Sequence, residues 1–169
     1  MATLIVFAGL PGVGKSSIAR ELARKTGAFW LRIDSIEQAI IVSGVMSFVN
    51  DAGYHVAQDV AADNLRLGHS VIADAVNGSV LAREGWRCAG DRCGARIIEV
   101  ETICSDSEEH RRRVETRLPD VRGLILPKWQ AVTTLEYEPW DRDHLTIDTA
   151  GRSVEDCASL VCEAMTEGA

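Results

Sequence analysis

The segment Gly9-Leu-Pro-Gly-Val-Gly-Lys-Ser16 limits what this chain can fold into more than any other part of it. Its spacing is that of a phosphate-binding loop: a glycine, four residues, then Gly-Lys-Ser. In such a loop, backbone N–H groups converge on one anion, Lys15 adds a positive charge near the β- and γ-phosphates, and Ser16 offers a hydroxyl to Mg²⁺. We therefore expect the nucleotide to contact Gly9, Pro11, Gly12, Val13, Gly14, Lys15, Ser16 and Ser17.

The flanking residues support this interpretation, because anion binding needs a loop between a strand and the N-terminus of a helix. Residues 3–8 are an apolar, β-rich run typical of a buried strand. Residues 17–25 place apolar side chains, including Ile18 and Leu22, on one helical face. A glycine-rich turn before a helix is the alternative, but such a turn requires neither the lysine nor the serine.

Strand-like and helix-like segments alternate along the chain. The pattern predicts strands over 3–8, 29–33, 70–73, 96–103 and 145–148. It predicts helices over 17–25, 35–43, 50–67, 80–87, 107–118 and 127–137, and one after the capping box that begins at Ser153. In the helix at 50–67, Val56 and Val60 share the expected apolar face with Gly53, and the stretches near 43–50 and 119–126 are expected to be mobile loops. The alternation predicts an α/β protein with a three-layer P-loop NTPase fold, a parallel sheet of about five strands, and one domain over residues 1–169.

Composition narrows the partners and the cellular location. The net charge of −7 argues against broad nucleic-acid binding, which needs a basic surface. The chain has no apolar stretch of the roughly 18 residues that a membrane span requires and no basic leader before its first strand, so we expect a cytoplasmic protein. Five scattered cysteines indicate reduced thiols. Cys88 and Cys93 have a spacing that zinc sites permit, but no second pair or histidine lies nearby at ligand spacing, so a zinc site is not expected.

Ligands of parallel α/β sheets bind beyond the carboxyl ends of the strands, so residues directly after each strand are the place to look for chemistry. Asp34 follows the second predicted strand, and Asp74 follows the third, with Asn77 close behind. Beside a triphosphate, a carboxylate in this place either holds Mg²⁺ or accepts the proton of an attacking hydroxyl. We expect Asp34 to be the catalytic base and Asp74 to belong to the metal and substrate site; the alternative for Asp34 is a cap of the helix beginning at Ser35.

The segment from 110 to 117 is rich in arginine. On a helix, Arg113 and Arg117 lie on one face, whereas Arg112 projects elsewhere. Guanidinium groups stabilise the charge that develops on a transferring phosphoryl group, so we expect Arg113 and Arg117 to bind nucleotide and act in catalysis, with Arg122 as a further nucleotide contact. A solvated basic helix face is the alternative. The surrounding residues, about 107–137 between the fourth and fifth strands, are interrupted by proline and glycine and are predicted to form a lid.

Taken together, the motifs resemble those of the small P-loop kinases related to nucleoside-monophosphate kinases, a group that includes zeta toxins, chloramphenicol phosphotransferase, gluconate and shikimate kinases and polynucleotide 5′-kinases. Many members carry only an AAA-type ATPase label. The resemblance covers nearly the whole chain and implies ATP, Mg²⁺, a lid arginine and an acceptor hydroxyl activated by Asp34. It also implies substrate contacts from Glu37, Asp74, Asn77 and Arg83. Some polynucleotide kinase-like members carry arginine at the position of Glu37, so this residue argues against an anionic, phosphate-bearing acceptor.

The sequence thus predicts an ATP-dependent phosphotransferase that acts on a hydroxyl of a small molecule. A polynucleotide or nucleotide 5′-kinase is the main alternative among enzymes, although the acidic composition and Glu37 count against it. An ATP-binding switch or ATPase that moves a partner protein is the alternative from another class.

Overall fold

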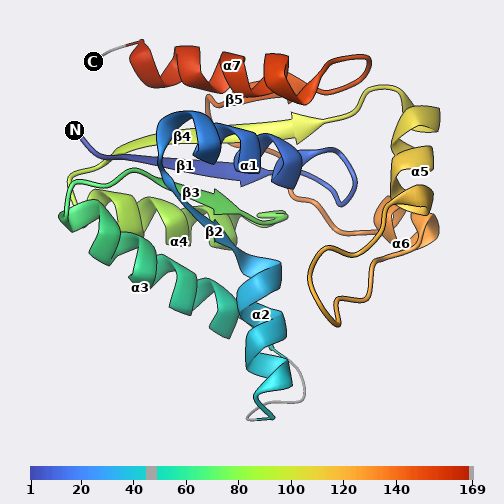
Figure 1. The fold of residues 1–169 in the computed structure, drawn as a ribbon, viewed down its shortest axis with the longest axis horizontal. Coiled ribbons are helices and arrows are strands. Elements are labelled where there is room, and N and C mark those ends of the chain that lie inside the picture. The colour runs from blue at the N-terminus through green and yellow to red at the C-terminus, as the bar shows by residue number, and fades with distance from the viewer. Residues whose placement is uncertain (45–48, 168–169) are drawn as a thin grey trace.

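The computed structural model of the protein describes residues 1–44 and 49–167. Its centre is a sheet of five parallel strands in the order β2-β3-β1-β4-β5 (Figure 1). The apolar β1 pairs with β3 on one side and with β4 on the other, so the most hydrophobic strand lies in the middle. The strands are β1 (Thr3–Ala8), β2 (Phe29–Arg32), β3 (Val71–Asp74), β4 (Arg96–Ile103) and β5 (Leu145–Asp148).

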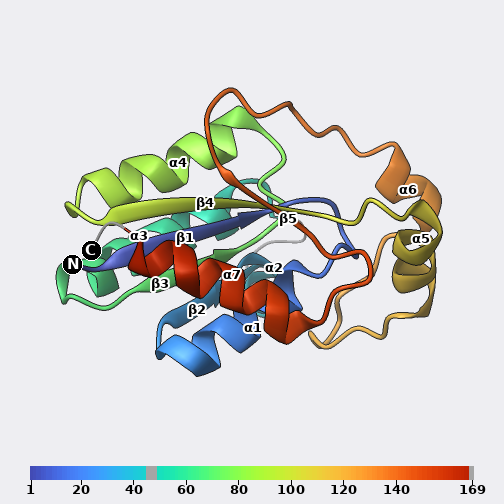
Figure 2. The same cartoon turned by 90° about the horizontal axis from the view of Figure 1, so that it is seen from above.

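Helices cover both faces of the sheet and make three layers (Figures 1 and 2). On one face, α1 (Lys15–Thr26) and α7 (Val154–Thr166) pack over a core that includes Ile5, Phe7 and Ile18. On the other face, α3 (Ala52–Arg66) and α4 (Val80–Asp91) pack over a second core that includes Leu4 and Trp86. The predicted α/β class, parallel sheet and three layers are therefore confirmed.

Three further helices surround the end of the sheet where the parallel strands finish. α5 (Ser107–Thr116) and α6 (Trp129–Thr133) lie beyond the carboxyl ends of the strands, and α2 (Ile33–Val42) extends from the end of β2 (Figure 1). The N-terminus and the end of α7 lie at the opposite end of the sheet (Figure 2). This arrangement leaves the carboxyl edge, with the phosphate-binding loop, as the place where a ligand can be enclosed.

Several predicted boundaries and one predicted face were wrong. The second strand ends at Arg32, the helix expected over 107–118 ends at Thr116, and the helix expected over 127–137 is a short one. In α3, Val56 and Val60 are 46% and 40% exposed, because Ala57 and Ala61 face the sheet instead. The small alanine side chains let this helix lie close to the strands. The resulting close packing favours the alanine face over the valine face, although valine has the larger apolar area. Residues 45–48, within one expected loop, lie outside the described residues, and 119–126 form no helix or strand, as predicted.

Candidate active site

A cavity of about 630 Å³ opens at the carboxyl edge of the sheet. Four parts of the chain line it: the phosphate-binding loop, the ends of β2 and β3, the segment after β5, and the stretch from α5 to Pro127. Of the eight loop residues predicted to bind nucleotide, six line the cavity, namely Pro11, Gly12, Gly14, Lys15, Ser16 and Ser17. Gly9 and Val13 are buried beneath the loop.

The loop depends on glycine at positions where a side chain would not fit. Gly9, Gly12 and Gly14 have φ angles of 135°, 88° and 108°, in the region that disfavours other residues. A Cβ at Gly9 would lie 2.2 Å from the carbonyl oxygen of Thr102, and one at Gly12 would lie 2.4 Å from Cγ2 of Val114. The loop backbone can therefore curl tightly only with these glycines, as a phosphate cradle requires.

Lys15 lies at the bottom of the cavity with only 8% of its surface exposed. Its Nζ donates a hydrogen bond to the carbonyl oxygen of Leu10, at 2.8 Å. Burial lowers the pKa of Lys15 to about 8, although the nearby carboxylates of Asp74 and Asp34 act in the opposite direction. An anion at this site would favour the charged form of the lysine.

Asp74 and Ser16 are the residues that could hold a magnesium ion. The Asp74 carboxyl is 2% exposed, accepts a hydrogen bond from Trp30 Nε1 at 3.1 Å, and is hydrogen-bonded to the Ser16 side chain. Burial raises the pKa of Asp74, and the charge of Lys15 partly offsets this. A carboxylate and a hydroxyl are the oxygen ligands that Mg²⁺ takes, and phosphate oxygens and water would complete its shell. The described residues contain no group of three or more His, Cys, Asp or Glu side chains around one metal position.

Asp34 lines the same cavity from the first turn of α2. The helix begins at Ile33 after Arg32, and no side chain caps it, so the alternative that Asp34 is a helix cap is wrong. Its side chain is 46% exposed and forms an ion pair with Arg32, with Oδ2 3.5 Å from Nη2. A carboxylate that faces a cavity beside Lys15 and Asp74 is available to a ligand.

The two arginines predicted to work together both line the cavity, and the other two do not. Arg113 is held by Thr149, with Nη1 2.7 Å from Oγ1 and Nη2 3.0 Å from the carbonyl oxygen. Arg117 directly follows α5 as its C-terminal cap residue. Its buried Nε has no hydrogen-bond partner in the described part of the chain. Burial lowers the pKa of Arg117, while the Asp34 carboxylate raises it. Arg112 and Arg122 are exposed and lie outside the cavity lining, so the structure does not bring Arg122 to the site.

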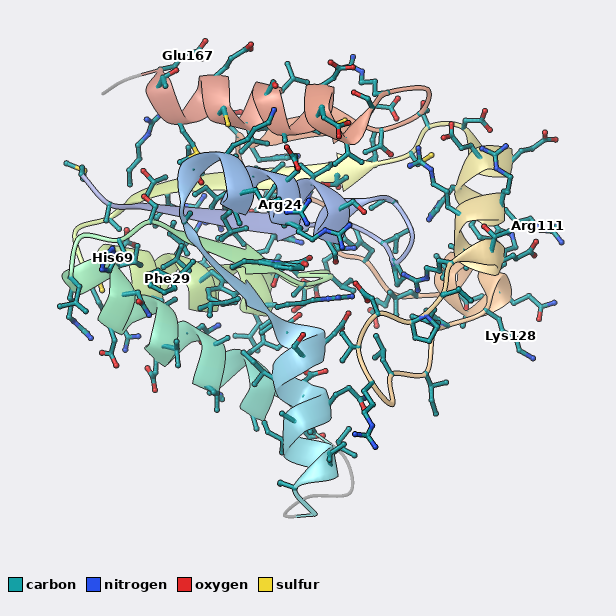
Figure 3. All side chains as sticks on the ribbon, viewed as in Figure 1. Arg24, Phe29, His69, Arg111, Lys128 and Glu167 are labelled. Atoms are coloured by element: carbon teal, nitrogen blue, oxygen red, sulfur yellow. The ribbon has the colours of Figure 1, made fainter. Side chains whose placement is uncertain are left out.

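Helix α5 is docked directly on the phosphate-binding loop. His110 Nε2 lies 2.9 Å from the carbonyl oxygen of Pro11, and Val114, 4% exposed, packs over Gly12. On the outer side of this region, Arg111 of α5 and Lys128 next to α6 point away from the rest of the molecule (Figure 3). One face of α5 therefore forms a wall of the cavity, and the opposite face is solvated.

Three residues expected to contact the substrate lie elsewhere. Asn77 is fully buried: its Nδ2 donates to Phe7 O at 2.6 Å, and its Oδ1 accepts from Trp86 Nε1 at 3.0 Å. Arg83 is 1% exposed and donates to the Asn77 and Pro139 carbonyls at 3.2 and 3.0 Å. Neither residue lines the cavity, so these two expectations were wrong. Asn77 ties the turn after β3 to β1 and α4, and Arg83 ties it to the chain near Pro139.

Glu37 is the third of these residues. It packs against Gly53 between α2 and α3 and is absent from the cavity lining. Burial and the nearby Asp34 carboxylate raise its pKa. Its charge therefore lies outside the cavity.

Other residues line the cavity although the sequence analysis did not select them. Arg32, at the end of β2, and Thr149, directly after β5, were both missed, as were Arg152, Ser153 and Val154. The rule about strand ends would have found the residues after β5 if it had been applied to that strand too. Arg32 lies within the predicted strand, so no signal in the sequence marked it as a residue of the strand end.

The comparisons with known proteins agree with this geometry. The profile of a family described as "AAA domain" matches residues 4–122. No curated protein has significant similarity to the chain. In the described residues, no helix combines the length and the apolar character needed to cross a bilayer.

Several solved structures with the same fold are kinases by name. A candidate kinase from Chloroflexus aurantiacus is 17% identical, with a TM-score of 0.74 over 99% of this chain and 98% of that one. The APS kinase CysC of Mycobacterium tuberculosis, in complex with AMPPNP and APS, is 17% identical, with a TM-score of 0.67 over 97% of each chain. A gluconokinase from Sinorhizobium meliloti is 18% identical, with a TM-score of 0.62 over 96% of this chain and 95% of that one. The resemblance to small P-loop kinases is therefore confirmed at the level of family and fold.

Proposed function

Because the chain belongs to the AAA domain family, with a kinase-like P-loop fold, we propose that it is an ATP-dependent phosphotransferase. It would move the γ-phosphoryl group of ATP to a hydroxyl of a small molecule, as a single domain over residues 1–169. One observation carries the proposal: a phosphate-binding loop with a buried Lys15 shares one cavity with a half-exposed carboxylate, Asp34, and an arginine, Arg117.

Each of these groups has a defined part in the transfer. The loop N–H groups and Lys15 hold the β- and γ-phosphates of ATP, and the segment from Arg152 to Val154 lines the remainder of the nucleotide side. The acceptor oxygen forms a bond to the γ-phosphorus while the bond to the bridging oxygen of ADP breaks. Asp34 accepts the proton that the hydroxyl loses. Arg117 has an unused N–H donor and stabilises the charge on the γ-phosphoryl oxygens.

Ser16 and Asp74 would hold Mg²⁺ with the phosphates. The ion supplies charge neutralisation and a fixed geometry for the phosphate oxygens.

The predicted lid over 107–137 divides into two parts in this proposal. α5 is the fixed part, because His110 and Val114 dock it on the phosphate-binding loop. The loop over 117–128 is the moving part, with Leu118 and Ile125 87% and 90% exposed. Closure of this loop over the cavity would exclude water and so protect ATP from hydrolysis.

The names of the neighbours support a small acceptor. One neighbour was crystallised with AMPPNP and APS, and another is a gluconokinase. The acidic composition fits such an acceptor better than a nucleic acid, and a supply of ATP fits a cytoplasmic location.

Lys15→Ala, compared with Lys128→Ala, tests the proposal. Lys128 is exposed and outside the cavity, so its variant keeps the fold and the site while losing the same charge. The wild-type protein and Lys128→Ala should be stabilised by about 2.7 kcal/mol at 100 times the Kd of a magnesium–ATP analogue, in a thermal-shift assay. Lys15→Ala should lose that stabilisation and all phosphoryl transfer from radiolabelled ATP to a panel of alcohols. Wild-type ATP turnover in folded Lys15→Ala would refute the proposed function.

A further inference from the structure

Arg32 is a charged residue of the cavity lining to which the proposed reaction gives no task. It ends β2, pairs in register with Asp74 of β3, and is two residues before the proposed base, Asp34. Its side chain is only 13% exposed. An arginine is seldom buried without partners, so its surroundings indicate what it binds.

The partners of Arg32 are carboxylates, and one of its donors is unused. Nη1 lies 2.8 Å from Oδ2 of Asp120, and Nη2 lies 3.5 Å from Oδ2 of Asp34. Its Nε is buried without a hydrogen-bond partner among residues 1–44 and 49–167. A guanidinium group takes a carboxylate best through two parallel N–H donors, so the Asp120 contact leaves this capacity partly unused.

Asp120 is a partner that can leave. It lies in the loop over 117–128 and its side chain is 52% exposed, so water competes with its ion pair. Asp34, by contrast, is held in the first turn of a helix. Asp120 therefore forms its ion pair with Arg32 within the cavity lining. The loop that carries Asp120 buries few of its own side chains.

A second arginine lies in the same cavity, so Arg32 is not alone in offsetting the carboxylates of Asp34, Asp74 and Asp120 around it. Arg117 lines the same cavity and also has a buried Nε without a partner in the described chain. Glu37, whose charge would oppose an anion, is turned toward Gly53 and does not line the cavity. The Glu37 carboxylate therefore lies outside the cavity lining, although its charge still interacts with that of Asp34.

We propose that Arg32 recognises a carboxylate on the acceptor molecule, and that Asp120 occupies the place of this carboxylate until the acceptor binds. The inference rests on the proposed function, and it assigns the acceptor to the hydroxy acids. The acceptor carboxylate would replace that of Asp120 on Nη1, while the acceptor hydroxyl faces Asp34. Asp120 would then be released to solvent with its loop.

Calorimetric titration with a matched pair of probes, D-glycerate and glycerol, tests this assignment in protein saturated with magnesium–AMPPNP. The two probes share hydroxyls and differ in the carboxylate. The wild-type protein should bind glycerate at least about tenfold more tightly than glycerol, since a charge-assisted pair is lost with the neutral probe. Arg32→Gln should abolish the preference, and Asp120→Asn should tighten glycerate binding by about three- to tenfold, because the competing carboxylate is gone.

Arg112→Gln is the control, since it removes an exposed arginine outside the cavity and should leave both affinities unchanged. Equal affinities for the two probes in the wild-type protein would overturn the inference. Weaker or unchanged glycerate binding in Asp120→Asn would also overturn it. The ion pair of Asp120 with Arg32 would then serve only to hold the loop in place. Asp120→Asn keeps the inference testable if Arg32→Gln does not fold. Failure of AMPPNP to bind in the same titrations would count against the proposed function itself, whereas AMPPNP binding without a preference for glycerate would count against this inference alone.

Discussion

Gly12→Ala should separate α5 from the phosphate-binding loop, and the structure gives the size of the effect. Gly12 has a φ angle of 88°, and a Cβ built on it lies 2.4 Å from Cγ2 of Val114. Carbon atoms that are not bonded rest about 3.5–4.0 Å apart, so one of the two elements must move. Val114 is buried at 4% exposure and has little room to retreat.

Two costs add at this position. An alanine in the left-handed region costs about 1–2 kcal/mol, and overpacking of a buried contact costs about 1–3 kcal/mol. We therefore expect Gly12→Ala to lower the free energy of unfolding by about 2–5 kcal/mol. Gly27→Ala isolates the first cost, because Gly27 has a φ angle of 72° and nothing lies within 4 Å of its added Cβ.

Urea denaturation followed by circular dichroism measures these differences. Gly27→Ala should be destabilised by about 1–2 kcal/mol, and Gly12→Ala by clearly more. Val114→Ala removes the atom that clashes, so the double variant Gly12→Ala, Val114→Ala should be more stable than the sum of the single changes predicts, by about 1–3 kcal/mol. If Gly12→Ala is no less stable than Gly27→Ala, and the cycle with Val114→Ala is additive, then α5 does not pack on the loop as described.

Three further predictions concern the chemistry of the cavity. Affinity for an ATP analogue should fall as the pH rises through about 8, because burial lowers the pKa of Lys15 to about 8 and only the charged lysine attracts phosphate. Calorimetry at pH 7 and pH 9 should show this loss equally in the wild-type protein and in the Lys128→Ala control. Asp34→Asn should keep ATP-analogue binding but slow transfer by about 10²-fold or more in a radiolabel assay, and undiminished transfer would exclude its role as base. Arg117→Ala should lower the turnover number more than the ATP affinity, whereas Arg113→Ala should mainly weaken nucleotide binding, since its guanidinium holds α5 to the end of β5. Arg112→Ala should match the wild-type protein in both assays. Near-wild-type kinetics for Arg113→Ala and Arg117→Ala would mean that neither arginine acts on the nucleotide.

Much of the fold could be predicted from the sequence, because its signals are local. The loop from Gly9 to Ser16 has a spacing that only a few backbone conformations accept, and strand β1 before it is apolar from its second residue on. Five strands, their parallel sheet and the position of the cavity then follow from the alternation of elements and from the rule about strand ends. Asp34, Asp74 and Arg117 were found in this way, because each stands close to the end of a strand or on a face set by helical spacing.

The use of each side chain, by contrast, depended on what the fold brings next to it. Asn77 and Arg83 have the residue types of a substrate site, yet distant carbonyl groups and Trp86 take all the hydrogen bonds described for them. Arg32 was expected to lie within a strand, and only the tertiary structure shows it in the cavity lining, paired with Asp120 from far along the chain. Residue type and spacing determine which element forms and where its end lies. The partners that satisfy a buried charge or amide come from segments remote in the sequence, so only the tertiary structure decides which polar residues remain free for a ligand.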